Sequence, residues 1–192
     1  MKQLISKTSA MLLLICLLVS SVNVQAADVV VKSEKYIKAE TTYKNWLNKQ
    51  SHSAWINRYE IADIDGNGIP ELMVTGYAFD AASTVYTYDT RTSKMKKLVS
   101  AYLGRSSNGL FYNPAKKMFY LVSSTTADLI YTVYKYSDGK LTKIDKYSWH
   151  VDKMSVKWKT TYKISGKKYT RAKWNSKWKK ASKGYRQLKN TF

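Results

Sequence analysis

The sequence has few of the residues that usually carry cross-links and acid–base chemistry. Its 192 residues include one cysteine, two histidines and two prolines. Cys16 is the single cysteine, so a disulfide within the chain is excluded and thiol catalysis downstream of it is excluded too. We interpret His52 and His150 as ordinary polar surface residues. No serine-nucleophile elbow, zinc-binding helix pattern or phosphate-cradling glycine loop occurs, so a small secreted hydrolase is only an alternative function.

The N-terminal residues predict export. Lys2 and Lys7 precede an apolar run from Met11 to Val19, and Val24-Gln25-Ala26 forms a small-residue cleavage site. The run is too short for a membrane-spanning helix, which needs about 20 apolar residues. We therefore predict a signal peptide at residues 1–26 and a single secreted, extracellular domain at 27–192. The lack of disulfides, and the abundance of Lys, Tyr, Asn and Ser, favour a Gram-positive bacterial source.

Positive charge is concentrated toward the C-terminus. The formal net charge is +20, and the segment from Lys135 to Phe192 holds 18 basic and three acidic residues, a net +15. Four of the six tryptophans lie in the same segment. Lysines interleaved with aromatic rings can bind anionic polymers.

The predicted partner is therefore an anionic cell-wall polymer, a glycan or a membrane surface. Nucleic acid is less favoured, because lysine greatly outnumbers the arginine that pairs with phosphates through two bonds. The alternatives are a membrane-active, toxin-like basic protein and lysines that merely solvate one face. The sequence indicates no oligomeric state.

The pattern of apolar residues predicts helices at the two ends of the domain and strands between them. A helix is expected over 33–49, capped by Ser33, with an apolar stripe that includes Ile37 and Tyr43. A second is expected over 171–181, capped by Thr170, with Trp174 and Trp178 in the core. The predicted strands are 58–63, 71–77, 83–89, 95–101, 109–112, 118–123, 129–136, 140–147 and 154–159.

Two hairpins are related by a weak internal repeat. Val85-Tyr86-Thr87-Tyr88 and the residues after its turn, 94–98, recur as Val133-Tyr134-Lys135-Tyr136 and 140–144. Two copies are too few for a closed propeller. We predict an α+β fold, in which an antiparallel β-meander forms an open or partly curled sheet with the N-terminal and C-terminal helices packed on it.

The segment DIDGNGIPE, from Asp63 to Glu71, has the composition of a calcium-binding loop. Calcium prefers six to eight oxygen ligands, and three carboxylates this close would repel one another without a cation. The sequence does not fit an EF-hand, because the twelfth position is Val74 and a strand follows the loop. We predict a weak structural calcium site; the alternative is a metal-free turn. The predicted ligands are Asp63, Asp65, Asn67, Ile69 (through its carbonyl) and Glu71.

The loop also matches the pattern D-x-[DN]-x-[DN]-G-x-x-[DE]-L, which ends here at Leu72. It resembles the strand–loop–strand calcium sites of FG-GAP and VCBS repeats in integrin-type propellers. The segment 61–76, IADIDGNGIPELMVTG, is also similar to secreted clostridial proteins that carry "IDGDGxPEL". The resemblance implies calcium and extracellular location. Because the chain has one such loop, it does not imply a full propeller.

Overall fold

The computed structural model describes residues 32–50, 56–76, 81–102, 104, 109–137, 139–153 and 157–191, all within one compact unit, Lys32–Phe192. The predicted signal peptide and cleavage site lie outside the described residues, as does His52.

The described residues form two helices and twelve strands, and the predicted α+β class with an antiparallel meander is confirmed. The helices are α2 (Glu34–Gln50) and α3 (Arg171–Ala181). The strands are β1 (Arg58–Ala62), β2 (Glu71–Thr75), β3 (Ala82–Asp89), β4 (Lys94–Tyr102), β5 (Leu110–Asn113), β6 (Met118–Ser124), β7 (Asp128–Ser137), β8 (Lys140–Asp152), β9 (Lys159–Ile164), β10 (Lys167–Tyr169), β11 (Arg186–Gln187) and β12 (Asn190–Thr191).

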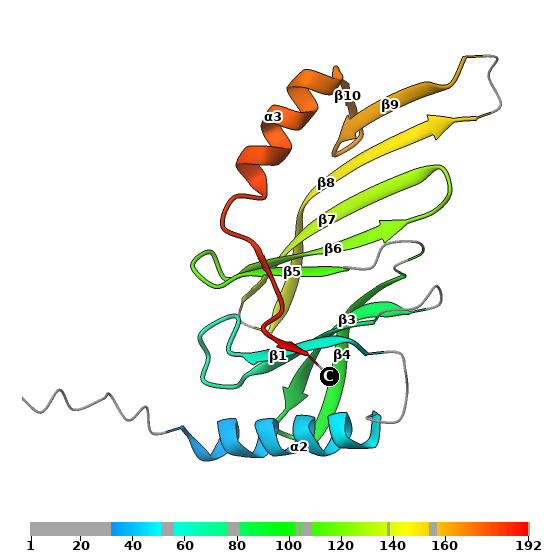
Figure 1. Cartoon of the computed structure of the whole chain (residues 1–192). Coiled ribbons are helices and arrows are strands. Elements are labelled where there is room, and N and C mark those ends of the chain that lie inside the picture. Colours follow the sequence, from blue (N-terminus) through cyan, green and yellow to red (C-terminus); the bar gives the residue numbers. More distant parts are fainter. Residues whose placement is uncertain are drawn as a thin grey trace, which may run out of the picture. The chain divides into compact units, whose positions relative to one another are not determined.

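The strands form two sheets rather than one (Figure 1). The five-stranded sheet, here sheet A, has the order β12-β1-β2-β3-β4. The seven-stranded sheet, here sheet B, has the order β10-β9-β8-β7-β6-β5-β11. Every pairing is antiparallel, and neither sheet closes into a barrel.

Helix α2 covers one face of sheet A. Ser33 caps it, since its hydroxyl accepts a hydrogen bond from the Tyr36 N–H at 3.2 Å. Ala39, Tyr43 and Leu47 recur every four residues and pack against buried side chains of β2 and β3. Ile37, predicted on the apolar stripe, is instead 52% exposed, because it lies on the opposite side of the helix from this row.

The other face of sheet A packs against sheet B. The core between them joins Ile64, Met73 and Val85 to a second group that comes from β5, β6, β7 and the C-terminal segment. That group is Leu110, Tyr112, Phe119, Leu121, Tyr136 and Leu188. Residues from both sheets and from the C-terminal segment therefore share the core between the sheets.

Helix α3 covers the opposite face of sheet B, where aromatic rings pack together with aliphatic side chains such as Val122, Val133 and Ile164. The Thr170 hydroxyl caps the helix by accepting from the Lys173 N–H. Trp174 is 5% exposed and Trp178 is half-buried, so the prediction that both belong to the core is confirmed. Their rings pack on tyrosines of β6, β7 and β8, with Trp178 lying 4.2 Å from Tyr131 between ring centroids.

The strand predicted over 154–159 is wrong at residues 157 and 158, and only its last residue, Lys159, lies in a strand. Residues 157 and 158 are not in a strand, β9 begins only at Lys159, and Trp158 is 71% exposed. Residues 154–156 lie outside the described residues. Strand β8 is also longer than predicted, because it continues to Asp152 and pairs with β9 along this extension.

The two repeated hairpins share an irregularity. In β3–β4 the register shifts between Val85 and Tyr86, and in β7–β8 it shifts between Val133 and Tyr134. These are equivalent positions of the repeat, one in each sheet. A bulge bends its strand and increases the local twist. The two copies of the repeat therefore share a bend at the same position, in addition to their alternation of polar and apolar residues.

The C-terminal segment joins the two sheets. Strand β11 pairs with β5 in sheet B, and β12 pairs with β1 in sheet A. Between these pairings, Arg186 donates two hydrogen bonds to Glu60 of β1, at 2.7 and 2.6 Å, and the Lys189 N–H donates a third. Glu60 is 5% exposed and the Arg186 side chain is 34% exposed, so this two-bond ion pair between the sheets joins a buried carboxylate to a half-buried guanidinium.

Candidate metal site and basic pocket

The loop from Asp63 to Glu71 connects β1 and β2 and brings three carboxylates together. Oxygen atoms of Asp63, Asp65 and Glu71 all lie within 4.8 Å of one another. Gly66 and Gly68 both have φ near +80°, a conformation that side chains disfavour, and these two residues turn the chain around the acidic group. Three of the five predicted ligands therefore lie close together. Such a set of carboxylate oxygens could bind a hard cation.

Glu71 is the buried member of the group. It is fully buried, and its oxygens accept hydrogen bonds from the Ile64 N–H at 2.9 Å and the Thr87 hydroxyl at 3.0 Å. Burial raises the pKa of Glu71 to about 8, and the neighbouring aspartates add to the effect. Two neutral hydrogen-bond donors do not balance the negative charge of a buried carboxylate. A bound cation would supply the positive charge that balances it.

The other two carboxylates order the loop. Asp63 accepts from the N–H groups of Gly66, Asn67 and Gly68. Burial raises the pKa of Asp65. The Asn67 side chain donates to Asp65 while its own oxygen accepts from the Ile69 N–H, so ligation by Asn67 and by the Ile69 carbonyl stays a prediction.

The loop also touches two turns of sheet B. The Lys117 ammonium, from the β5–β6 turn, lies 3.4 Å from the Asp65 carbonyl oxygen. The Gly139 backbone, from the β7–β8 turn, lies near the Asp65 carboxylate and opposes part of the rise in its pKa. A hydrogen bond from Tyr43 to the Pro70 carbonyl oxygen, 2.9 Å long, ties α2 to the end of the loop. The site therefore lies where sheet A, sheet B and α2 meet.

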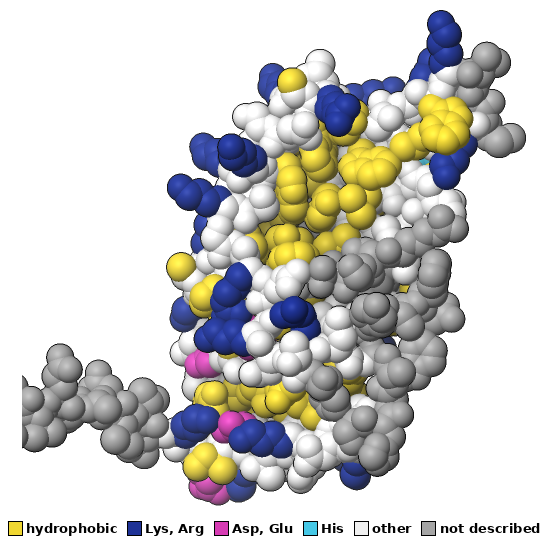
Figure 2. Space-filling view, viewed as in Figure 1, with side chains coloured by type: hydrophobic (Ala, Val, Ile, Leu, Met, Phe, Trp, Pro, Cys, Tyr) yellow, Lys and Arg dark blue, Asp and Glu magenta, His cyan; other side chains and the backbone are white. Residues whose placement is uncertain are grey.

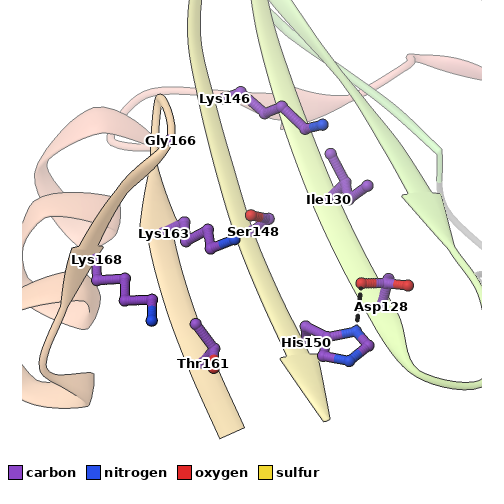
Figure 3. Close-up of a pocket in the computed structure, with 9 residues that line it drawn as sticks. All are labelled: Asp128, Ile130, Lys146, Ser148, His150, Thr161, Lys163, Gly166 and Lys168. Atoms are coloured by element: carbon purple, nitrogen blue, oxygen red, sulfur yellow. Dashed lines mark hydrogen bonds and ion pairs between the residues drawn. The ribbon is translucent and has the colours of Figure 1, made fainter. Parts of the chain in front are cut away.

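A second candidate site is a pocket of about 560 Å³ on sheet B, here called the basic pocket (Figure 3). Lys146 of β8, Lys163 of β9 and Lys168 of β10 contribute three ammonium groups from three strands. The remaining lining residues are Asp128, Ile130, Ser148, His150, Thr161 and Gly166.

The strand register shows which face of sheet B carries this pocket. Leu121 of β6 lies in the core between the sheets and is directly opposite Thr132 of β7. Thr132 is in turn opposite Lys146 of β8. Two residues further along β8, Ser148 is on the same face and is opposite Lys163 of β9. Directly opposite residues share a face. The face that packs on sheet A at β5 and β6 therefore continues over β8 to β10 as the lining of the basic pocket.

Asp128 and His150 form a pair at one end of the pocket. The His150 Nδ1 lies 2.9 Å from an Asp128 oxygen, and the His150 side chain is 52% exposed (Figure 3). The prediction of a polar surface histidine is confirmed in its exposure, but the sequence did not reveal the carboxylate partner. The available signal was the alternation of Lys146, Ser148 and His150 with aromatic residues, which marks one polar strand face.

The chain matches no family model, no curated protein and no solved structure. Within the part of the chain that the structure describes, neither helix is long and apolar enough to cross a membrane.

Proposed function

We propose that this is a secreted binding protein that attaches to an anionic cell-surface polymer through the basic pocket. The observation that carries the proposal is that Lys146, Lys163 and Lys168, from three strands, all line one concave surface. Charges of one sign in a concave site concentrate oppositely charged ligands near it. The Ser148 and Thr161 hydroxyls can add hydrogen bonds to phosphate or carboxylate oxygens.

The pocket suits attachment better than hydrolysis. A glycosidase needs two carboxyl groups that flank the scissile bond, whereas among the described residues Asp128 is the only carboxylate that lines this pocket. That carboxylate is also held by His150. The lysines are ammonium groups on flexible stems, which bind diffuse charge rather than one fixed geometry.

Calcium is the second part of the proposal. The donors in the acidic loop are carboxylate oxygens, which suit a hard cation, and the resemblance to FG-GAP loops also favours calcium. The residues that would hold the ion are Asp63, Asp65 and Glu71, with Asn67 and the Ile69 carbonyl completing the set. The ion would neutralise the buried Glu71 carboxylate and stabilise the junction of the two sheets.

The attachment is tested with a poly(glycerol phosphate) polymer, by titration at low and high salt. We expect Lys146→Gln combined with Lys163→Gln to weaken binding about tenfold and to lower the salt dependence. The control is Lys179→Gln combined with Lys180→Gln, which removes the same charge from exposed positions on α3. Equal losses in the two double variants would show that net charge, and not the pocket, governs binding.

A further inference from the structure

A second pocket, of about 410 Å³, lies on the other face of sheet B, beside α3. It is lined by Trp149, Thr160 and Tyr162 from the sheet and by Arg171, Trp174 and Asn175 from the helix. Trp149 and Tyr162 alternate along their strands with His150 and Thr161, which line the basic pocket. The sheet thus separates two pockets of different chemistry.

Trp174 is the fixed ring of this aromatic pocket. Trp174 is 5% exposed, and its Nε1 donates to the Lys163 carbonyl oxygen at 3.1 Å. Tyr162 lies 5.8 Å from Trp174 between ring centroids and is directly opposite Trp149 in the register. Trp149 and Tyr162 are only half-buried, so part of each ring reaches the surface.

Figure 2 shows apolar side chains gathered on the surface beside α3, with lysines around them. Rigid aromatic rings offer a large contact area and lose little side-chain entropy when a ligand binds.

Polar groups stand at the edge of these rings. Arg171 and Asn175 are four residues apart on α3, so they lie on the same side of the helix. The Arg171 guanidinium only donates hydrogen bonds, whereas the Asn175 amide and the Thr160 hydroxyl both donate and accept. None of the six lining residues is acidic, and one is charged.

We propose that the aromatic pocket binds an uncharged sugar ring of a glycan. A sugar ring presents C–H groups on its faces and hydroxyls around its rim, which matches apolar walls with a few hydrogen-bonding groups at the edge. A nucleobase could also stack here. A nucleic acid strand, however, brings one phosphate per nucleotide, and of the described residues that line the pocket Arg171 alone is a cation that could pair with it.

The test uses an array of neutral hexasaccharides of the glucose, N-acetylglucosamine, mannose and galactose series, followed by titration calorimetry with any sugar that is retained. We expect retention of at least one series, with an affinity that added salt leaves unchanged. Trp149→Ala should weaken this binding about tenfold through loss of ring contact. Because Trp149 is partly buried, its replacement could also disturb the fold.

Asn175→Ala provides the independent variant, since Asn175 is exposed on α3. We expect it to weaken binding about fivefold through loss of a hydrogen bond. The matched control is Ser176→Ala, at the neighbouring exposed helix position, which should bind as the unmodified protein does.

Two results would overturn the sugar proposal. One is that no neutral series is retained, including the case in which an oligothymidylate binds at this pocket instead. The other is that sugar binding persists in both Trp149→Ala and Asn175→Ala. The lysine variants of the basic pocket should leave neutral-sugar binding unchanged. The sugar array therefore tests the aromatic pocket, and the polyanion titration separately tests the basic pocket.

Discussion

Replacing Glu71 by glutamine should remove a loss of stability that the metal-free protein shows as pH rises. Glu71 is fully buried, and its pKa in the folded protein is about 8, against an ordinary value of 4.5. Between these two pH values the folded state holds a proton that the unfolded state has released. The free energy of unfolding of the metal-free protein therefore falls as pH rises through this window.

The size of the effect follows from the shift in pKa. At about 1.4 kcal/mol per pH unit, a rise from 4.5 to about 8 corresponds to roughly 5 kcal/mol lost by pH 8, as an upper value. In Glu71→Gln the side chain has the same shape, and its oxygen can still accept from the Ile64 N–H. The variant should therefore lack this loss.

Calcium should oppose the loss in the unmodified protein. For a site with Kd of about 10⁻⁴ to 10⁻³ M, about 5 mM calcium adds roughly 1–2 kcal/mol of stability. That corresponds to an increase in Tm of about 2–9 °C for a domain of this size. The increase should be absent in Asp65→Ala and reduced in Glu71→Gln.

The assay is thermal unfolding at pH 5.5 and pH 8, with chelator or with calcium, for the unmodified protein and both variants. The reasoning about Glu71 fails if the stability difference between the unmodified protein and Glu71→Gln is the same at both pH values in chelator. The metal proposal fails if the unmodified protein at pH 8 has the same Tm and the same unfolding curve in calcium, in magnesium and in chelator.

Three further predictions concern stability and can be measured by urea unfolding. Arg186→Met should cost roughly 3–5 kcal/mol, because it leaves Glu60 buried and unpaired, and adding Glu60→Leu should recover part of the loss. Trp174→Ala should cost about 3–5 kcal/mol, whereas Trp174→Phe should cost less because most of the ring contact remains. Gly104→Ala should cost roughly 2 kcal/mol or more, since φ is +59° and the added Cβ would lie 1.7 Å from the Ser124 carbonyl oxygen; an unchanged midpoint would show that this turn relaxes freely.

The regular elements were predictable because each has a local pattern. Ser33 and Thr170 are N-caps at the two helix starts, and both cap their helices. The acidic loop was predictable for the same reason, since its residues are adjacent in the sequence. The division of the strands into two sheets was not, because it depends on contacts between distant segments such as β1 and β12.

The two pockets on sheet B were missed for the same reason. Lys146 and Lys163 line one pocket because β8 continues to Asp152 and pairs there with β9, whereas the sequence predicted that this strand would end near Tyr147. The segment beyond was assigned to a separate strand that included Trp158. The count of lysines and tryptophans indicated a binding surface, but the register determines that lysines face one side and aromatic rings the other.

The crossing of the C-terminal segment between the sheets has a consequence for how the domain folds and unfolds. Glu60 and Arg186 are 126 residues apart in the sequence, and β1 cannot complete its pairing until β12 arrives. Closing so long a loop is slow, because the chain loses conformational entropy before the contacts of the C-terminal segment form. Once closed, the segment links the two sheets through its backbone pairings with β5 and β1. We therefore expect the slowest amide hydrogens of β1 and β5 to exchange together, in a single cooperative opening of the domain.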